Sequence, residues 1–233
     1  MHVTRRSADR GLADFGWLKS RHTFSFGDYY DPAHMGFGPL RVINEDQVAP
    51  GQGFGKHPHR DMEILSWVLE GTLEHKDSLG TGAQIYPGEL QRMSAGTGVM
   101  HSEFNGSKTE PVHFLQIWVI PNRSGLTPSY EQHRFPPQEL ANQWRLLASG
   151  KPRNGALTIH QDVELYATRL GTGQHLDHVP SPGRKLWLQV ARGTIATGGE
   201  VLSAGDGAAW SDPPSIRVTS KGDAELLLFD MAP

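Results

Sequence analysis

The chain has 233 residues, enough for one large all-β domain or two small domains, each with a hydrophobic core. Its formal net charge of -3 provides no basic field for phosphate backbones, so direct binding to nucleic acid is not expected. Cysteine is absent, which excludes disulfides, thiolate metal sites and cysteine nucleophiles, so a metal here would need nitrogen and oxygen ligands.

The N-terminal stretch MHVTRRSADRGLADFGW contains arginines but no apolar segment after them. No window of the chain approaches the roughly 18 apolar residues that a membrane helix needs. We therefore expect a cytoplasmic protein without membrane contact.

The following segments predict β-strands, because they are short, rich in β-branched, leucine and aromatic residues, and bounded by turn-forming residues. The 27 glycines and 16 prolines of the chain also favour many strands joined by turns over a helical bundle. In chain order the segments are residues 39–50, 63–78, 112–121, 184–199 and 225–231. This punctuation is typical of a β-barrel or β-sandwich.

One segment, PPQELANQWRLLASG at residues 136–150, has a helical pattern. It lies between the two halves of the chain, where we expect a short helical connector.

Two pairs of similar segments indicate an internal repeat. Residues 93–103 (MSAGTGVMHSE) match residues 202–212 (LSAGDGAAWSD), and residues 68–75 (VLEGTLEH) match residues 190–197 (VARGTIAT). The order of the two matches is the same, so we infer two diverged copies of one β unit.

Under these matches the second copy lacks every imidazole of a candidate site in the first copy. The equivalences place His57 at Val179, His59 at Ser181, Glu63 at Lys185, His101 at Trp210 and Glu103 at Asp212. Histidines needed for structure would be expected twice on one scaffold. The pattern therefore favours one functional site in the first copy and no corresponding site in the second.

The candidate site consists of two pairs of residues with strand spacing. His57 and His59 are separated by one residue, as are His101 and Glu103, so each pair points to one face of its strand. On neighbouring strands of a closed barrel these side chains would converge as three imidazoles and one carboxylate. This donor set indicates Fe(II), Mn(II), Ni(II), Co(II) or Zn(II), with positions left open for substrate or dioxygen.

The place of Glu63 stays open at this level. It shares parity with His57 and His59, so a straight strand would add it to the ligands, whereas a bulge would turn it away. His75, beside Lys76 and Asp77, has the context of a turn, and we expect it to be structural or solvated.

Three stretches carry a resemblance to a known family. HPHRDMEILSWVLEG (residues 57–71), with Gly51 before it, resembles the first cupin motif, and GTGVMHSEFN (residues 96–105) resembles the second, with Gly96 in place of the usual proline. Residues 21–64, from RHTFSFGDYYDP to HPHRDMEI, resemble the pirin family more specifically. The resemblance covers essentially the whole chain.

The resemblance implies an all-β bicupin fold: two antiparallel, jelly-roll-like β-barrels packed face to face. It implies an N-terminal metal-binding cupin domain at residues 1–135 and a degenerate C-terminal cupin domain without metal at residues 136–233. The implied ligands of one divalent metal are His57, His59, His101 and Glu103, with Glu63 in the shell around them. Fe(II) is the expected metal, with Ni, Co, Mn, Cu and Zn as alternatives.

The function implied by the resemblance is that of a metal-dependent quercetin 2,3-dioxygenase, which opens a flavonol with dioxygen and releases carbon monoxide. Glu103 is the expected catalytic base, and Glu63 acting through a water is the alternative. Another family role is that of a non-enzymatic regulator with a protein partner, in which the metal is a redox sensor or a structural element. We expect a monomer, because two fused barrels already cover each other's faces.

Overall fold

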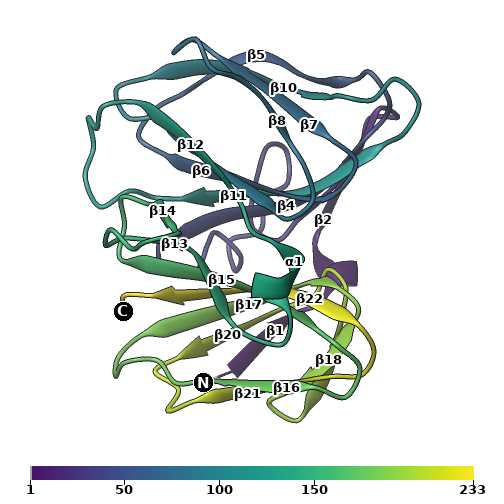
Figure 1. The fold of residues 1–233 in the computed structure, drawn as a ribbon, viewed down its shortest axis with the longest axis vertical. Helices are drawn as coiled ribbons and strands as arrows, with labels where there is room; N and C mark the ends of the chain where they lie inside the picture. Colours follow the sequence, from purple (N-terminus) through teal and green to yellow (C-terminus); the bar gives the residue numbers. More distant parts are fainter. Residues whose placement is uncertain (1) are drawn as a thin grey trace. The chain divides into compact units, whose positions relative to one another are not determined.

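The computed structural model describes residues 2–233, and these residues form mainly antiparallel strands (Figure 1). They group into two compact units. The N-terminal unit contains residues 11–134 and 159–161, and the C-terminal unit contains residues 2–10, 135–158 and 162–233. The units therefore differ from the expected ranges 1–135 and 136–233 at residues 2–10, residue 135 and residues 159–161.

The N-terminal unit has two sheets, which appear as two layers in Figure 1. In spatial order, the seven-stranded sheet contains β12 (Ser129–Arg134), β9 (Glu89–Ser94), β6 (Glu63–Glu70), β11 (Val112–Val119), β4 (Leu40–Val48), β3 (Leu18–His22) and β2 (Gly11–Asp14). The four-stranded sheet contains β5 (Gly53–His59), β10 (Val99–Asn105), β7 (Leu73–Asp77) and β8 (Gly82–Ile85). The inner faces of these two sheets enclose the interior of the barrel.

The C-terminal unit repeats this arrangement. Its seven-stranded sheet contains β1 (His2–Arg5), β20 (Gly207–Ser211), β17 (Lys185–Arg192), β22 (Ala224–Met231), β15 (Val163–Leu170), β13 (Arg145–Ser149) and β14 (Leu157–Thr158). Its four-stranded sheet contains β16 (His175–His178), β21 (Ile216–Ser220), β18 (Thr194–Thr197) and β19 (Glu200–Ser203). A 3-10 turn, η1 (Ser7–Asp9), follows β1.

The expected strands are confirmed, and the expected short helical connector is present but occupies only part of its segment. The five segments predicted from composition contain β4, β6 with β7, β11, β17 with β18, and all of β22 except Ala224. Within residues 136–150 only α1 (Pro137–Leu140) is helical, and β13 occupies the end of the segment. Backbone pairing of β13 with β15 and β14 overrides the helical pattern there. Within residues 2–233, the structure contains no helix with the length and apolar character to cross a membrane.

Strand order defines the internal repeat. The order β12-β9-β6-β11-β4-β3 corresponds to β1-β20-β17-β22-β15-β13, and β5-β10-β7-β8 corresponds to β16-β21-β18-β19. The match of residues 68–75 with 190–197 joins equivalent strands and is correct. The match of residues 93–103 with 202–212 is wrong, because it aligns β10 with β20 instead of β21.

A shared turn sequence explains the wrong match. Ser-Ala-Gly-x-Gly connects β9 to β10 in the first unit but β19 to β20 in the second. Gly96 and Gly205 both have a positive φ, of 45° and 86°, which favours glycine. The sequence thus recurs because two different turns have the same backbone requirement.

The strand register gives a different equivalence for the first histidine. His101 on β10 pairs with His57 on β5, and Ile216 on β21 pairs with His178 on β16. His178 therefore stands at the place of His57, and the prediction that the second copy loses every imidazole is wrong.

The two ligand candidates on β10 have apolar counterparts in the C-terminal unit. Pairing with β7 and β18 aligns Asn105 with Ser220, which places Ile216 at the position of His101 and Val218 at that of Glu103. Both apolar residues are buried in the hydrophobic core of the C-terminal unit. Asymmetry between the copies is thus located on this strand, where the second copy has core residues instead of ligands.

The interior of the N-terminal barrel has a polar layer between two apolar clusters. Phe114 on β11 belongs to one cluster and Trp118, four residues later, packs against the other, with Gln116 between them on the same face. β6 has the same pattern, with Ser66 between Val68 and Ile64. Cross-strand pairing extends the layer across the sheet, in the order Gln132, Gln91, Ser66, Gln116, Asn44 and His22.

Candidate metal centre

Three neighbouring strands of the four-stranded sheet bring the candidate ligands into register. His57 on the edge strand β5 pairs with His101 on β10, and His101 pairs with Asp77 on β7. A bulge between His101 and Glu103 interrupts the register with β5. It leaves the parity of β10 itself unchanged, so His101 and Glu103 both face the interior.

His57, His59 and His101 form a compact cluster. Their ring centroids lie 4.5 to 4.8 Å apart in all three pairs, and one ligand atom from each lies within 4.8 Å of the others. The Nε2 atoms of His57 and His101 are 3.0 Å apart. Two nitrogens bound at right angles to one metal at about 2.1 Å would be separated by about 3.0 Å. The spacing therefore fits two adjacent ligands of an octahedral ion.

The hydrogen-bond partners show which ring nitrogens are available. Nδ1 of His57 lies 2.7 Å from the carbonyl oxygen of Gly55, so Nδ1–H is the donor and Nε2 carries the lone pair. Nε2 of His59 is buried and has no hydrogen-bond partner within residues 2–233. A buried imidazole nitrogen without a partner is costly unless a ligand occupies its lone pair. These donors fit a divalent metal.

Burial keeps the imidazoles of His59 and His101 neutral, which is the form that binds a metal. It lowers the pKa of His101 to about 2, with a further contribution from His57, His59 and His75 nearby. It lowers the pKa of His59 to about 4, again with His57 adding to the effect. The rings are therefore available as ligands over the whole physiological pH range.

Glu103 supplies the carboxylate of the cluster. Gln116 donates Nε2–H to its Oε2 at 2.7 Å, and the Ser66 hydroxyl lies 3.3 Å from its Oε1. Burial, followed by the charge of Asp46, raises the pKa of Glu103 to about 7. Positive charge is thus favourable at this point, and Oε2 lies 3.9 Å from Nε2 of His101.

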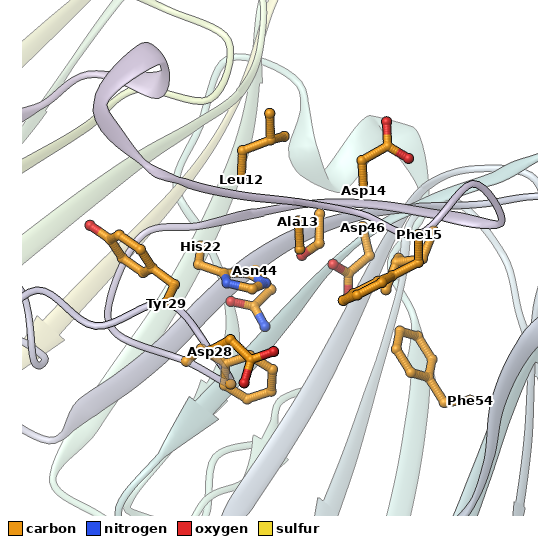
Figure 2. Close-up of a pocket in the computed structure, with 14 residues that line it drawn as sticks. Leu12, Ala13, Asp14, Phe15, His22, Asp28, Tyr29, Asn44, Asp46 and Phe54 are labelled. Carbon is orange, nitrogen blue, oxygen red and sulfur yellow. The ribbon is translucent and has the colours of Figure 1, made fainter.

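A cavity of about 580 Å³ (Figure 2) is linked to the cluster through aromatic side chains. Phe26 lines it and stacks edge-on against Trp118 at 5.3 Å, and Trp118 stacks against His59 at 5.0 Å. Asp46 lines it as well and acts electrostatically on Glu103. These contacts connect the cavity to the cluster.

The cavity combines aromatic walls with a polar floor. Phe15, Phe54 and Tyr29 line it, and His22 and Asn44 point toward it in Figure 2. Ser20 and Asn44 are buried, and neither Ser20 Oγ nor Asn44 Oδ1 has a hydrogen-bond partner within residues 2–233. The size and the chemistry are those of a site for a small organic molecule with polar substituents.

Comparison with known proteins supports a family assignment. The family model described as Pirin matches residues 3–119, and the one described as Quercetinase C-terminal cupin domain matches residues 146–231. A quercetin 2,3-dioxygenase of Escherichia coli (strain K12) is 48% identical over 233 residues, which are 100% of both chains. The chain belongs to the pirin family. The resemblance of the sequence of this pirin to the family is therefore confirmed.

Two solved structures support the bicupin architecture. The bacterial pirin YhhW from Escherichia coli, in complex with nickel(II), superposes with a TM-score of 0.95 at 48% identity, and the alignment covers 100% of both chains. YhaK from the same species superposes with a TM-score of 0.75 at 30% identity, covering 96% of this chain and 98% of its own. The all-β bicupin fold expected from the sequence is confirmed.

Glu63 lies on a different strand from His57 and His59. In this pirin it begins β6, a strand of the other sheet, because Asp61 has a φ of 47° and turns the chain after β5. It is three residues from Ser66 and therefore faces away from the barrel interior. Its carboxylate accepts the backbone N–H of His160 at 3.2 Å and lies 3.3 Å from the His160 ring. Even spacing from His57 and His59 therefore does not place Glu63 on their face, because β5 ends at His59 and β6 begins at Glu63.

His75 and Asp77 are the residues of this centre that the sequence interpretation missed. They lie on β7, and their side chains are 0% exposed. Nδ1 of His75 is 3.4 Å from Nδ1 of His101, and Nε2 of His75 is 3.0 Å from Oδ2 of Asp77. The i, i+2 spacing of His75 and Asp77 is the signal that could have found them, since it repeats the spacing of the other two pairs.

Proposed function

We propose that this pirin is a metal-dependent quercetin 2,3-dioxygenase. The observation that carries the proposal is the cluster of His57, His59 and His101, with the Glu103 carboxylate 3.9 Å from His101, together with a cavity of about 580 Å³ that has aromatic walls. Its full-length identity of 48% to the quercetin 2,3-dioxygenase of Escherichia coli supports the same substrate class, a flavonol.

His57, His59, His101 and Glu103 would hold one divalent metal ion. Three imidazole nitrogens and one carboxylate oxygen suit several first-row metals. Iron(II) is the metal that the resemblance implies, and nickel(II) is the ion bound by YhhW, so both belong in the test. When bound, the metal supplies a Lewis acid with open positions, which lowers the pKa of a coordinated hydroxyl group.

The cavity would bind the flavonol. Phe15, Phe26 and Phe54 offer aromatic surfaces for the fused rings, and aromatic pairs contribute about 0.5–1.5 kcal/mol beyond area burial. Ser20 Oγ and Asn44 Oδ1 are unpaired within residues 2–233 and would pair with hydroxyl groups of the substrate. Such pairing removes the cost of leaving these two buried atoms unsatisfied.

Glu103 would accept the proton of the 3-hydroxyl group on a carboxylate oxygen. Gln116 and Ser66 hold the carboxylate in place, and a bound metal would keep it ionised and able to accept a proton. In the overall reaction the bonds from C3 to C2 and C4 break, and C3 leaves as carbon monoxide. Both atoms of dioxygen enter the ester product, and the proton ends on its new carboxyl group.

The C-terminal unit would act without a metal. Ile216 and Val218 stand where His101 and Glu103 stand in the N-terminal unit, and both pack in an apolar core. At the position equivalent to His57 the C-terminal unit has another histidine, His178. Nε2 of His178 lies 2.8 Å from Oδ2 of Asp230. The unit therefore supports a structural role.

The direct test is turnover by the whole purified chain loaded with iron(II) or with nickel(II). Quercetin consumption, followed by its absorbance, should equal the moles of oxygen taken up and of carbon monoxide released. His101→Ala and Glu103→Gln should lose this activity. The control is His113→Ala, which should retain it, because His113 on β11 forms a separate half-buried pair with Glu45 on β4. No oxygen uptake by either fully loaded form would overturn the proposal.

A further inference from the structure

His101 is linked to a buried pair of residues on the neighbouring strand. Asp77 Oδ2 lies 3.0 Å from Nε2 of His75, and Nδ1 of His75 lies 3.4 Å from Nδ1 of His101. The side chains of all three are 0% exposed. The contacts form a continuous line from Asp77 through two imidazoles to the Nε2 atom that faces His57.

The chemistry of these atoms indicates where the hydrogens lie when a metal occupies Nε2 of His101. An ionised carboxylate only accepts, so Nε2 of His75 is the donor to Asp77. A neutral His75 then has its lone pair on Nδ1. Two nitrogens at this separation form a hydrogen bond when one of them carries a hydrogen, so Nδ1–H of His101 is the donor. Nε2 of His101 is left with a lone pair directed at the metal position.

The local structure holds this line in one arrangement. Oδ1 of Asp77 accepts the backbone N–H groups of Leu79 and Thr81 at 2.9 and 3.0 Å, which fixes the carboxylate in the turn after β7. The ring of Tyr130 lies 4.8 Å from the His75 ring, centroid to centroid. Backbone pairing places His75 opposite Glu103 and Asp77 opposite His101. Neither imidazole is therefore positioned by the other alone.

We propose that His75 and Asp77 are positioning residues of the metal centre, which set the tautomer of His101 and thereby keep its Nε2 free for the metal. Asp77 orients His75, and His75 accepts the Nδ1–H of His101. This inference rests on the metal centre of the proposed function but not on the identity of the substrate. Outer hydrogen-bond partners of a metal ligand typically change metal affinity by about 10 to 100-fold when they are lost.

A second use of His75 is as a ligand itself, because His75, His101 and Glu103 also place ligand atoms within 4.8 Å of one another. Both ring nitrogens of His75 already have partners, Asp77 and His101. A metal on His75 would require one of these two contacts to break. Its geometry therefore favours the positioning role.

Asp77→Asn is the most informative variant. The amide can donate to Nε2 of His75, which would move the hydrogen of His75 to Nδ1 and that of His101 to Nε2. The dissociation constant for nickel(II), measured by competition with a chelator on the whole chain, should rise about 10 to 100-fold. Glu45→Gln is the matched control, because Glu45 faces His113 at the same 3.0 Å outside the centre and should leave the constant unchanged.

Substitutions of His75 complete the test. His75→Leu should weaken nickel binding about as much as Asp77→Asn, whereas His75→Gln, whose amide oxygen can accept from His101, should recover most of the affinity. Long-range nitrogen–proton NMR of the metal-free chain should find His101 protonated on Nδ1 in the wild type and on Nε2 in Asp77→Asn. Both readouts are independent of turnover, so an inactive wild type would leave them intact.

Two results would overturn the proposal. One is a nickel dissociation constant within twofold of the wild type in both Asp77→Asn and His75→Leu. The other is the loss of one coordinated imidazole in the X-ray absorption spectrum of nickel-loaded His75→Gln, which would make His75 a ligand. If His75→Leu fails to fold, as judged by thermal unfolding, Asp77→Asn and His75→Gln decide the question.

Discussion

The Nε2 atoms of His57 and His101 face each other at 3.0 Å, and both carry lone pairs when each ring has its hydrogen on Nδ1, as the contact of His57 with Gly55 requires and as we propose for His101. Two lone pairs at this distance repel unless a cation lies between them. Metal binding should therefore stabilise the fold. At a free metal concentration 100 times the dissociation constant the gain is about 2.7 kcal/mol.

Thermal unfolding with and without a chelator measures this gain. The melting temperature of the wild type should rise with nickel(II) concentration and fall again when the chelator is added. His101→Ala should show little dependence on the metal. A wild-type melting temperature that is the same in chelator and in excess nickel would contradict the presence of a site here.

The pH dependence of the metal-free protein should reveal Glu103. Its folded pKa is raised from 4.5 to about 7, so between these values the folded state binds more protons than the unfolded state. This group therefore lowers the free energy of unfolding as pH rises from about 4.5 to 7, by at most about 3 kcal/mol. His59 and His101 act in the opposite direction, because their folded pKa values are lowered and they favour the folded state as pH rises toward 6.5.

Comparing the wild type with Glu103→Gln isolates the carboxyl group, since both contain the same histidines. Urea unfolding of the metal-free proteins at pH 5 and at pH 8 should show that Glu103→Gln gains stability relative to the wild type at the higher pH. An unchanged difference between the two pH values would mean that Glu103 titrates normally. With metal present the sign reverses, because the bound form needs the carboxylate and metal affinity rises with pH.

The sequence predicted the donor set because that prediction needs only local parity. His57 with His59, and His101 with Glu103, each occupy alternate positions of one strand, and a barrel leaves little freedom for where such pairs point. The strand segments were predictable for a similar reason, since composition and turn residues are local signals. Residue spacing and punctuation therefore sufficed for the fold class and for the main candidates.

What failed depended on strand register, which a single sequence does not encode locally. Glu63 has the right parity but lies on β6, after the chain has turned at Asp61. The Ser-Ala-Gly-x-Gly repeat reflects turn geometry and aligned strands that are not equivalent. His75 looked like a turn residue, and its role appears only when β7 pairs with β10.

Glu63→Gln tests the position of Glu63 directly. The carboxylate is buried and bound to the backbone N–H of His160, so the change should lower the free energy of unfolding by about 1–3 kcal/mol. The nickel dissociation constant should remain within about threefold of the wild type, since 3-fold corresponds to about 0.7 kcal/mol. A tenfold weaker nickel affinity would mean that Glu63 acts on the metal site.

Asn44→Leu tests whether the cavity recognises substrate hydroxyl groups. Asn44 is buried on β4, and its Oδ1 has no hydrogen-bond partner within residues 2–233. Its cross-strand neighbour on β11 is Gln116, whose side-chain amide donates to Glu103. If this oxygen accepts a hydroxyl group of quercetin, the variant should bind quercetin about 10-fold more weakly, equivalent to about 1.4 kcal/mol. Binding of 3-hydroxyflavone, which lacks the other hydroxyl groups, should change little, because the metal-directed group is the same in both compounds.

Fluorescence quenching by each flavonol gives the four dissociation constants of this comparison without any need for turnover. Stability of Asn44→Leu should equal or exceed that of the wild type, since the substitution removes a buried acceptor that has no partner within the described chain. Equal weakening for both flavonols would assign Asn44 to the shape of the cavity, and no weakening for either would place the polyphenol outside it. Weakening confined to quercetin would locate its hydroxylated rings between β3, β4 and the aromatic wall at Phe15 and Phe54.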